Sequence, residues 1–165
     1  MKKQNKTTRG KYEPLQLAYI AGFFDGEGTI CIGRIKPRHK KDSKNTYTLT
    51  VRVVGTKKDI IQLHYDLFSP HRTIKSYKYR KEFIAYQWTL TSLNALKFLK
   101  LIEPYIILKK EQVKLGIEFQ EKKNKDNFRG LFIPDSEIEK REEYRLKMRK
   151  LNERNKSGFT HSRND

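Results

Sequence analysis

The chain has 165 residues, enough for one domain with its own hydrophobic core and too few for two ordinary domains. It carries 37 Lys and Arg residues against 19 Asp and Glu residues, a formal net charge of +18. So large a cationic excess predicts a polyanionic partner such as nucleic acid. The sequence contains no apolar run as long as a membrane span and no signal-like segment after its lysine-rich start, so we expect no membrane partner and an intracellular protein, organellar or in a prokaryotic cytoplasm, that is not secreted.

The positive charge is concentrated in the first part of the chain. Residues 1–100 hold 21 basic and 7 acidic side chains, whereas residues 101–165 hold 16 and 12. We therefore expect the binding surface within the first hundred residues. A single cysteine, Cys31, excludes an internal disulfide and is expected to be buried, and the four histidines lack the spacing of zinc ligands.

The predicted elements alternate between helices and hairpins. A first helix is expected over 13–24, with Pro14 in its first turn and Gly26 and Gly28 ending it. Two alternating runs predict a hairpin, and the next helix opens with Thr56 and Asp59 in a capping-box arrangement. A second hairpin and three more helices complete the list: strands at 29–40, 46–54, 73–79 and 83–91, and helices at 56–68, 92–102, 108–121 and 136–155.

This order predicts an α+β fold, an αββαββα saddle with one antiparallel four-stranded sheet and helices on one face. The expected organisation is a basic N-terminal arm (1–12), a core (13–121), a polar linker (122–135), a solvated or loosely docked C-terminal helix (136–155) and a flexible tail (156–165).

The other face of the sheet is predicted to bind DNA. In the second strand, Leu49, Val51 and Val53 alternate with threonines and Arg52, which gives one apolar and one polar side. A bulge near Gly33 is expected to shift the first strand so that its later basic residues join the polar side. The predicted DNA-binding set is Arg34, Lys36, Arg38, Thr46, Thr48, Thr50, Arg52, Lys75, Tyr77 and Gln87.

The first helix carries a stripe of small residues, Ala18, Ala21, Gly22 and Asp25, at spacings of i, i+3, i+4 and i+7. Leu17, Ile20 and Phe24 form a bulky stripe beside it, suited to the core of the chain itself. No other helix has a matching small stripe, so we expect a second copy of the same helix to pack there and form a homodimer.

Two carboxylates, Asp25 and Glu27, lie among glycines in a strongly basic region. An acid beside a DNA backbone is repelled unless a divalent cation lies between them, and Mg²⁺ suits a site of one or two carboxylates with phosphate oxygens and water; Mn²⁺ or Ca²⁺ fits the same ligands. The alternative is that both are ordinary helix-end and turn residues.

The segment "IAGFFDGEG" (20–28) resembles the signature of the LAGLIDADG homing endonucleases, and the element order is similar to that family's core. The resemblance implies a saddle-shaped sheet on double-stranded DNA, with single-motif chains acting as homodimers. It implies that Glu27 is a catalytic metal ligand, assisted by the Gly26 carbonyl, and that Lys109, in "PYIILK", is an active-site cation. Asp25 is then expected to cap and pack the helix junction, and Gly55 stands where some relatives have a polar residue that organises water, with Lys57 or Lys58 as candidate replacements.

The prediction is therefore an intron-encoded, metal-dependent endonuclease that cuts a long pseudo-palindromic DNA site as a homodimer. Two alternatives stay open: a maturase that binds intron RNA, and a non-catalytic DNA-binding regulator on the same fold. The sequence does not identify the target site or the host gene.

Overall fold

The computed structural model describes residues 12–36, 44–69, 74–79, 83–125, 128 and 133–154. Arg38, nearly all of the basic arm and the tail fall outside these residues. Among the helices that are described, none is both long and apolar enough to cross a bilayer.

The observed elements follow the predicted order. The helices are α1 (Pro14–Glu27), α2 (Lys58–Phe68), α3 (Ser92–Ile102), α4 (Lys110–Lys125) and α5 (Asp135–Arg154), with a short 3₁₀ turn, η2 (Glu103–Tyr105), between α3 and α4. The strands are β1 (Gly28–Ile35), β2 (Thr46–Gly55), β3 (Lys75–Tyr79) and β4 (Phe83–Thr91).

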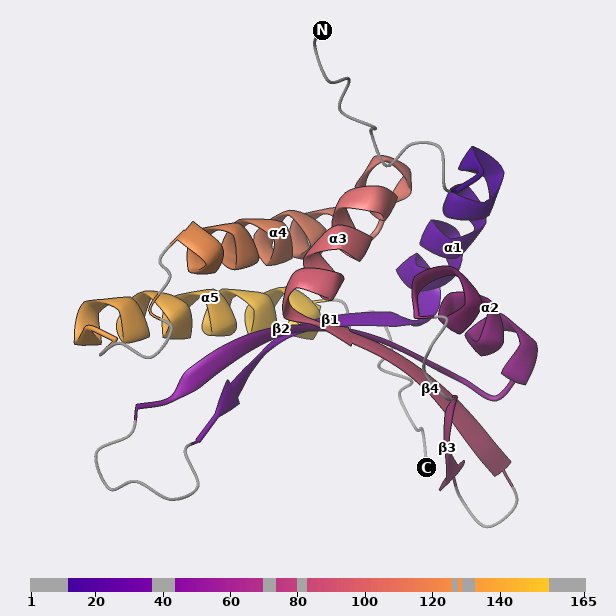
Figure 1. Ribbon diagram of the computed structural model, residues 1–165, viewed down its shortest axis with the longest axis horizontal. Helices are drawn as coiled ribbons and strands as arrows, with labels where there is room; N and C mark the ends of the chain where they lie inside the picture. Colours follow the sequence, from indigo (N-terminus) through magenta and orange to yellow (C-terminus); the bar gives the residue numbers. More distant parts are fainter. Residues whose placement is uncertain are drawn as a thin grey trace, which may run out of the picture.

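The four strands form one antiparallel sheet in the order β1-β2-β4-β3. Figure 1 shows the helices on one side of this sheet, while the two hairpins curve away from them on either side and leave a concave face. The predicted α+β saddle with helices on one face is confirmed.

Helix α1 continues through Gly26 to Glu27, three residues beyond the predicted end. Its bulky stripe enters the core as expected, because Ile20 and Phe24 are fully buried and Leu17 nearly so. The chain can turn into β1 only with glycine at position 28, where a Cβ atom would overlap the Phe24 ring and carbonyl.

Aromatic rings fill the core between helices and sheet. The Trp88 and Phe98 ring centroids are 4.9 Å apart in an edge-on arrangement, and Phe24 and Phe68 contact the same Phe98 ring. The predicted cap of α2 is wrong: the capping position is Lys57, with no side-chain hydrogen bond, so Thr56 lies before the cap.

The predicted bulge in β1 is also wrong. Residues 28–35 pair with residues 53–46 one for one, in a register without interruption at Gly33. Directly opposed residues share a face of the sheet, so Arg34 lies on the same face as its partner, the buried Tyr47. That is the helix side, where an Arg34 nitrogen is 3.9 Å from a Glu142 carboxylate oxygen of α5.

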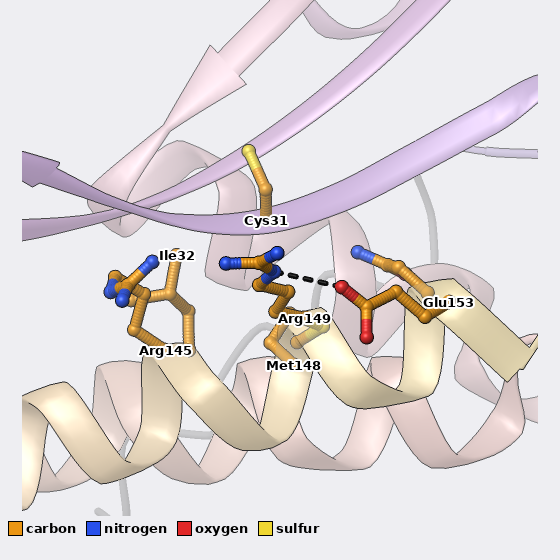
Figure 2. A pocket seen from close by; sticks show the side chains of 7 residues that line it. Cys31, Ile32, Arg145, Met148, Arg149 and Glu153 are labelled. Carbon is orange, nitrogen blue, oxygen red and sulfur yellow. Dashed lines mark hydrogen bonds and ion pairs between the residues drawn. The ribbon is translucent and has the colours of Figure 1, made fainter.

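Helix α5 is firmly docked, which contradicts the expectation of a solvated or loosely attached element. Met148 is 1% exposed, the Tyr47 hydroxyl donates to Glu142 at 2.8 Å, and the Asn152 amide donates to the Ile30 carbonyl at 2.9 Å. Figure 2 shows α5 running beneath β1, with Ile32 directed toward the helix and Cys31 directed away from it. Sequence periodicity misjudged α5 because Met148 is its one buried apolar side chain among the described residues, and its hydrogen bonds to the sheet are long-range.

Candidate active site and nucleic-acid interface

Asp25 is a structural residue of the junction between α1 and the start of α4. Its carboxylate is 7% exposed. It accepts hydrogen bonds from the backbone N–H groups of Ile107, Leu108 and Lys109 at 2.7, 2.9 and 3.0 Å. A carboxylate with three such bonds is held in place and satisfied by its own chain, as the sequence analysis expected for a capping residue.

Glu27 is the last residue of α1 and is exposed. The C-terminal end of a helix carries partial negative charge, so a carboxylate there favours a nearby cation. The Lys109 ammonium supplies one: it donates to the Asp25 carbonyl and, at 3.5 Å, to the Gly26 carbonyl. Burial lowers the pKa of Lys109, and the carboxylates of Asp25 and Glu27 oppose that shift.

A depression of about 570 Å³ adjoins Glu27. Its lining includes Gly55, which stands where some relatives have a polar residue that organises water, and Lys57, one of the two candidate replacements. Tyr77 of β3 also lines it. Lys58 is not part of the lining. The fold thus brings Lys57 to the same hollow as the candidate catalytic acid.

Most of the predicted DNA-binding residues lie on the concave face. In β2, Thr48 and Thr50 are half-buried and Thr46 and Arg52 exposed, in alternation with buried Leu49, Val51 and Val53. The strand pairing carries this face across the sheet, since Arg52 opposes Thr89, and Gln87 opposes Lys75. Tyr77 is two residues from Lys75 along β3 and so belongs to the same face.

The β1 contribution to this face differs from the prediction. The polar residues of β2 are Thr46, Thr48, Thr50 and Arg52. The β1 residues opposite them are Ile35, Gly33, Cys31 and Thr29. Arg34 lies on the helix side, and Lys36 follows the last paired residue of β1. Cys31 is half-buried on the polar face rather than in the core, and burial raises the pKa of its thiol. Strict alternation of side chains along β1, continued through Gly33 without a bulge, would have placed Thr29, Cys31, Gly33 and Ile35 on the polar face.

The small stripe of α1 divides between the core and the surface. Ala21 is fully buried and Asp25 nearly so, within the chain itself, so neither faces outward as predicted. Ala18 and Gly22 are exposed, together with Gly26. A Cβ atom added at Gly22 or Gly26 would meet nothing within 4 Å. The outward row of small residues is therefore Ala18, Gly22 and Gly26.

Large apolar side chains border this row. Leu15 and Tyr19 of α1 are 85% and 59% exposed, and Ile107 and Leu108, beside Asp25, are 80% and 72% exposed. The sequence analysis did not identify these four residues as part of a surface, because their clustering depends on the hydrogen bonds that hold the 107–109 backbone against α1.

The oxygen donors at the end of α1 suit a hard divalent cation, because Mg²⁺ binds carboxylates and carbonyls. Glu27 offers an exposed carboxylate, and Gly26 offers a carbonyl that also accepts a hydrogen bond from Lys109. Across the described ranges, no group of three or more His, Cys, Asp or Glu side chains is arranged to hold a metal ion.

No protein-family model matches the chain, and no curated protein shows significant sequence similarity to it. Solved structures do match. The homing endonuclease I-CvuI, in complex with its target in the presence of Ca, aligns over 83% of this chain and 82% of its own, with a TM-score of 0.62 and 18% identity. A second I-CvuI complex, with Mg and uncleaved DNA, gives a TM-score of 0.63 and 17% identity over 92% of this chain and 86% of that chain.

Two further matches extend the comparison. The archaeal intron-encoded homing endonuclease I-Vdi141I, complexed with DNA, aligns over 85% of this chain and 86% of its own, with a TM-score of 0.65 and 12% identity. The LAGLIDADG homing endonuclease I-GzeII, in complex with a DNA target, aligns over 88% of this chain but 49% of its own, with a TM-score of 0.62 and 19% identity. The chain therefore has the fold of the LAGLIDADG homing endonucleases.

Proposed function

We propose that this protein is a site-specific endonuclease that hydrolyses both strands of a duplex DNA site with a divalent metal ion, acting as a homodimer. The observation that carries the proposal is the meeting of Glu27 and Lys109 at one end of the concave sheet face. A surface that only bound DNA would gain nothing from an exposed carboxylate beside the phosphates. The structural neighbours were solved in complex with DNA, which supports duplex DNA as the partner of this chain.

Glu27 and the Gly26 carbonyl would hold the metal ion, with Mg²⁺ as the cofactor and Mn²⁺ or Ca²⁺ able to occupy the same oxygen ligands. When bound, such an ion activates a water molecule for attack on the phosphorus and stabilises the leaving oxygen. The Lys109 ammonium donates hydrogen bonds to the carbonyls of residues 25 and 26 and would stabilise negative charge that develops on the phosphate. Lys57 lines the same hollow as Glu27 and would add a second cation beside the metal ligand.

The second copy of the chain is proposed to pack on the outward face of α1. Ala18, Gly22 and Gly26 leave room for close backbone approach, and Leu15 and Tyr19 provide apolar area beside them. Exposed apolar patches of this kind mark protein contacts. A two-fold axis through this face would bring the Glu27 residues of the two copies together, one for each DNA strand. This interface replaces the Ala21 and Asp25 contacts expected from the sequence.

The proposal is tested with a plasmid library that carries a randomised duplex insert. We expect the full chain with Mg²⁺ to linearise a subset of plasmids that share one pseudo-palindromic motif. Glu27→Gln should lower the cleavage rate at least about 100-fold and leave affinity for the selected site unchanged, because it removes a metal ligand and no DNA contact. The control is Glu13→Gln, an exposed acid before the other end of α1.

Cleavage by Glu27→Gln at the wild-type rate would overturn the active-site assignment. Specific binding of duplex DNA without cleavage in any divalent metal would instead support the non-catalytic regulator. Binding of intron RNA without recognition of any duplex site would support the maturase.

A further inference from the structure

The β1–β2 half of the concave face presents an unusual row of side chains to DNA. Its opposed pairs are Thr29 with Arg52, Cys31 with Thr50, Gly33 with Thr48, and Ile35 with Thr46. Among these residues Arg52 is the sole cation and Ile35 the sole large apolar side chain. Because threonine hydroxyls both donate and accept hydrogen bonds and tolerate several bases, base selectivity in this row falls mainly to its two atypical members.

Arg52 occupies the middle of the sheet. It opposes Thr29 on one side and Thr89 on the other, so both flanking side chains are short. It is exposed and forms no ion pair with any of the residues that the structure describes. An unpaired guanidinium with free space around it can donate two parallel hydrogen bonds to the O6 and N7 atoms of guanine in the major groove.

Ile35 ends β1 and is 54% exposed. An isolated exposed isoleucine needs no explanation on an ordinary surface. On a face that meets DNA bases, however, its branched side chain cannot form hydrogen bonds, and the base feature that favours apolar contact in the major groove is the 5-methyl group of thymine. Its neighbour Arg34 is directed to the helix side and pairs with Glu142, so it does not share this contact.

The strand fixes the order of the two contacts along the duplex. Arg52 opposes Thr29, two residues after Glu27, and so lies at the catalytic end of the sheet. Ile35 lies six residues beyond Thr29, a distance of about 20 Å along a strand. Since each base pair adds 3.4 Å, the Ile35 contact falls outward of the Arg52 contact by at most about six base pairs.

We infer that Arg52 reads a guanine near the cleavage position and that Ile35 reads a thymine methyl group farther out in the same half-site. This inference rests on the proposed function and adds the bases that the site must contain. It also reverses an expectation from the sequence, because the apolar Ile35, and not the adjacent Arg34, contacts the bases.

The test is selection of bound duplexes from a randomised library in the presence of Ca²⁺, followed by sequencing. The wild-type chain should select a pseudo-palindrome with an inner G and an outer T in each half. Arg52→Gln should convert the inner preference from G to A, because glutamine pairs with adenine, with discrimination changed roughly 5- to 150-fold. Ile35→Ala should relax the outer T alone. Arg34→Ala is the matched control and should leave all base preferences unchanged.

The outcomes separate the inference from the proposed function. If the folded wild-type chain selects no motif, the proposed function fails and this inference fails with it. If the wild-type chain selects a motif and Arg52→Gln leaves every position unchanged, or Arg34→Ala alters the outer base while Ile35→Ala does not, the base assignments are wrong and the endonuclease proposal stands.

Discussion

At the residue scale, the two acids of the motif lie in different surroundings although they are only two positions apart. Asp25 is buried and accepts three backbone hydrogen bonds, whereas Glu27 is exposed and accepts none from the described residues. The difference follows from the helical geometry of α1, in which residues two apart point in different directions. One acid therefore stabilises the fold and the other remains available to ligate a metal ion.

Asp25→Asn should reduce the free energy of unfolding by about 2–3 kcal/mol, because an amide loses the charge that strengthens the three bonds and presents a nitrogen that cannot accept them. Urea denaturation measures the change. Glu27→Gln, in contrast, should leave the unfolding free energy within about 0.5 kcal/mol of the wild-type value. Equal destabilisation by the two substitutions would contradict this division of roles.

A buried histidine gives the protein a pH-dependent stability. His64 is fully buried, its Nδ1 is 2.7 Å from the Ile60 carbonyl, and its Nε2 has no partner among the described residues. Burial lowers the pKa of His64 below the ordinary 6.5, against the raising effect of the Ile60 hydrogen bond. Below about pH 6.5 the unfolded chain then binds a proton that the folded chain excludes, so stability falls as the pH falls.

We expect the wild-type unfolding free energy to fall by up to about 1.4 kcal/mol per pH unit from this group as the pH drops below about 6.5. His64→Phe should lack this pH-dependent loss of stability. The unfolding free energy of the wild type relative to that of the variant should therefore fall at acid pH. Parallel urea titrations at several pH values provide the measurement. A wild-type and variant pair with identical pH dependence would exclude His64 as the source.

At the element scale, α5 packs along the edge of the sheet and stabilises it. It contacts β1, the edge strand of the predicted DNA-binding hairpin, through buried Met148 and through the Asn152 hydrogen bond to the Ile30 carbonyl. Glu142 connects three other groups, because it accepts from Tyr47 and from Arg145 and lies near Arg34. These bonds lower the pKa of Glu142 to about 2, with the Arg145 hydrogen bonds as the largest cause.

Met148→Ala should therefore destabilise the whole domain by about 2–5 kcal/mol, the usual cost of removing a buried methionine side chain. Leu146→Ala is the matched control, two residues away on the same helix with a side chain that is 48% exposed, and should change stability by less than about 0.5 kcal/mol. Thermal unfolding followed by circular dichroism compares them. A separate, earlier melting transition in the wild-type protein would show that α5 unfolds independently of the core.

At the scale of the whole molecule, the proposed assembly depends on a helix surface that the monomer leaves uncovered. Gly22 has open space around it within the chain, yet a glycine inside a helix costs about 1 kcal/mol relative to alanine. The proposed contact with a second copy would explain the glycine, because overpacking at a close helix crossing is unfavourable. Ala21 is fully buried in the core of the monomer, so a substitution there would not test the contact between copies.

Gly22→Leu should weaken dimerisation roughly 5- to 150-fold, corresponding to about 1–3 kcal/mol of overpacking, while it leaves the helix content of the monomer intact. Sedimentation velocity over a range of concentrations measures the shift. Lys114→Leu, an exposed α4 position away from α1, is the control. A Gly22→Leu protein that dimerises as well as the wild type would exclude this face as the interface.

The sequence by itself determined the order of the elements and the fold class, because hydrophobic periodicity and turn residues are local properties. It also indicated that Asp25 caps the helix junction. Only the tertiary structure decided on which side of the sheet Arg34 lies, which small residues of α1 are buried, and that α5 packs against the sheet. These depend on strand register and on long-range contacts such as Tyr47 with Glu142 and Asp25 with the 107–109 backbone. Because one shifted residue in a strand reverses the face of each residue beyond it, a single misjudged bulge at Gly33 was enough to move Arg34 to the wrong side of the sheet.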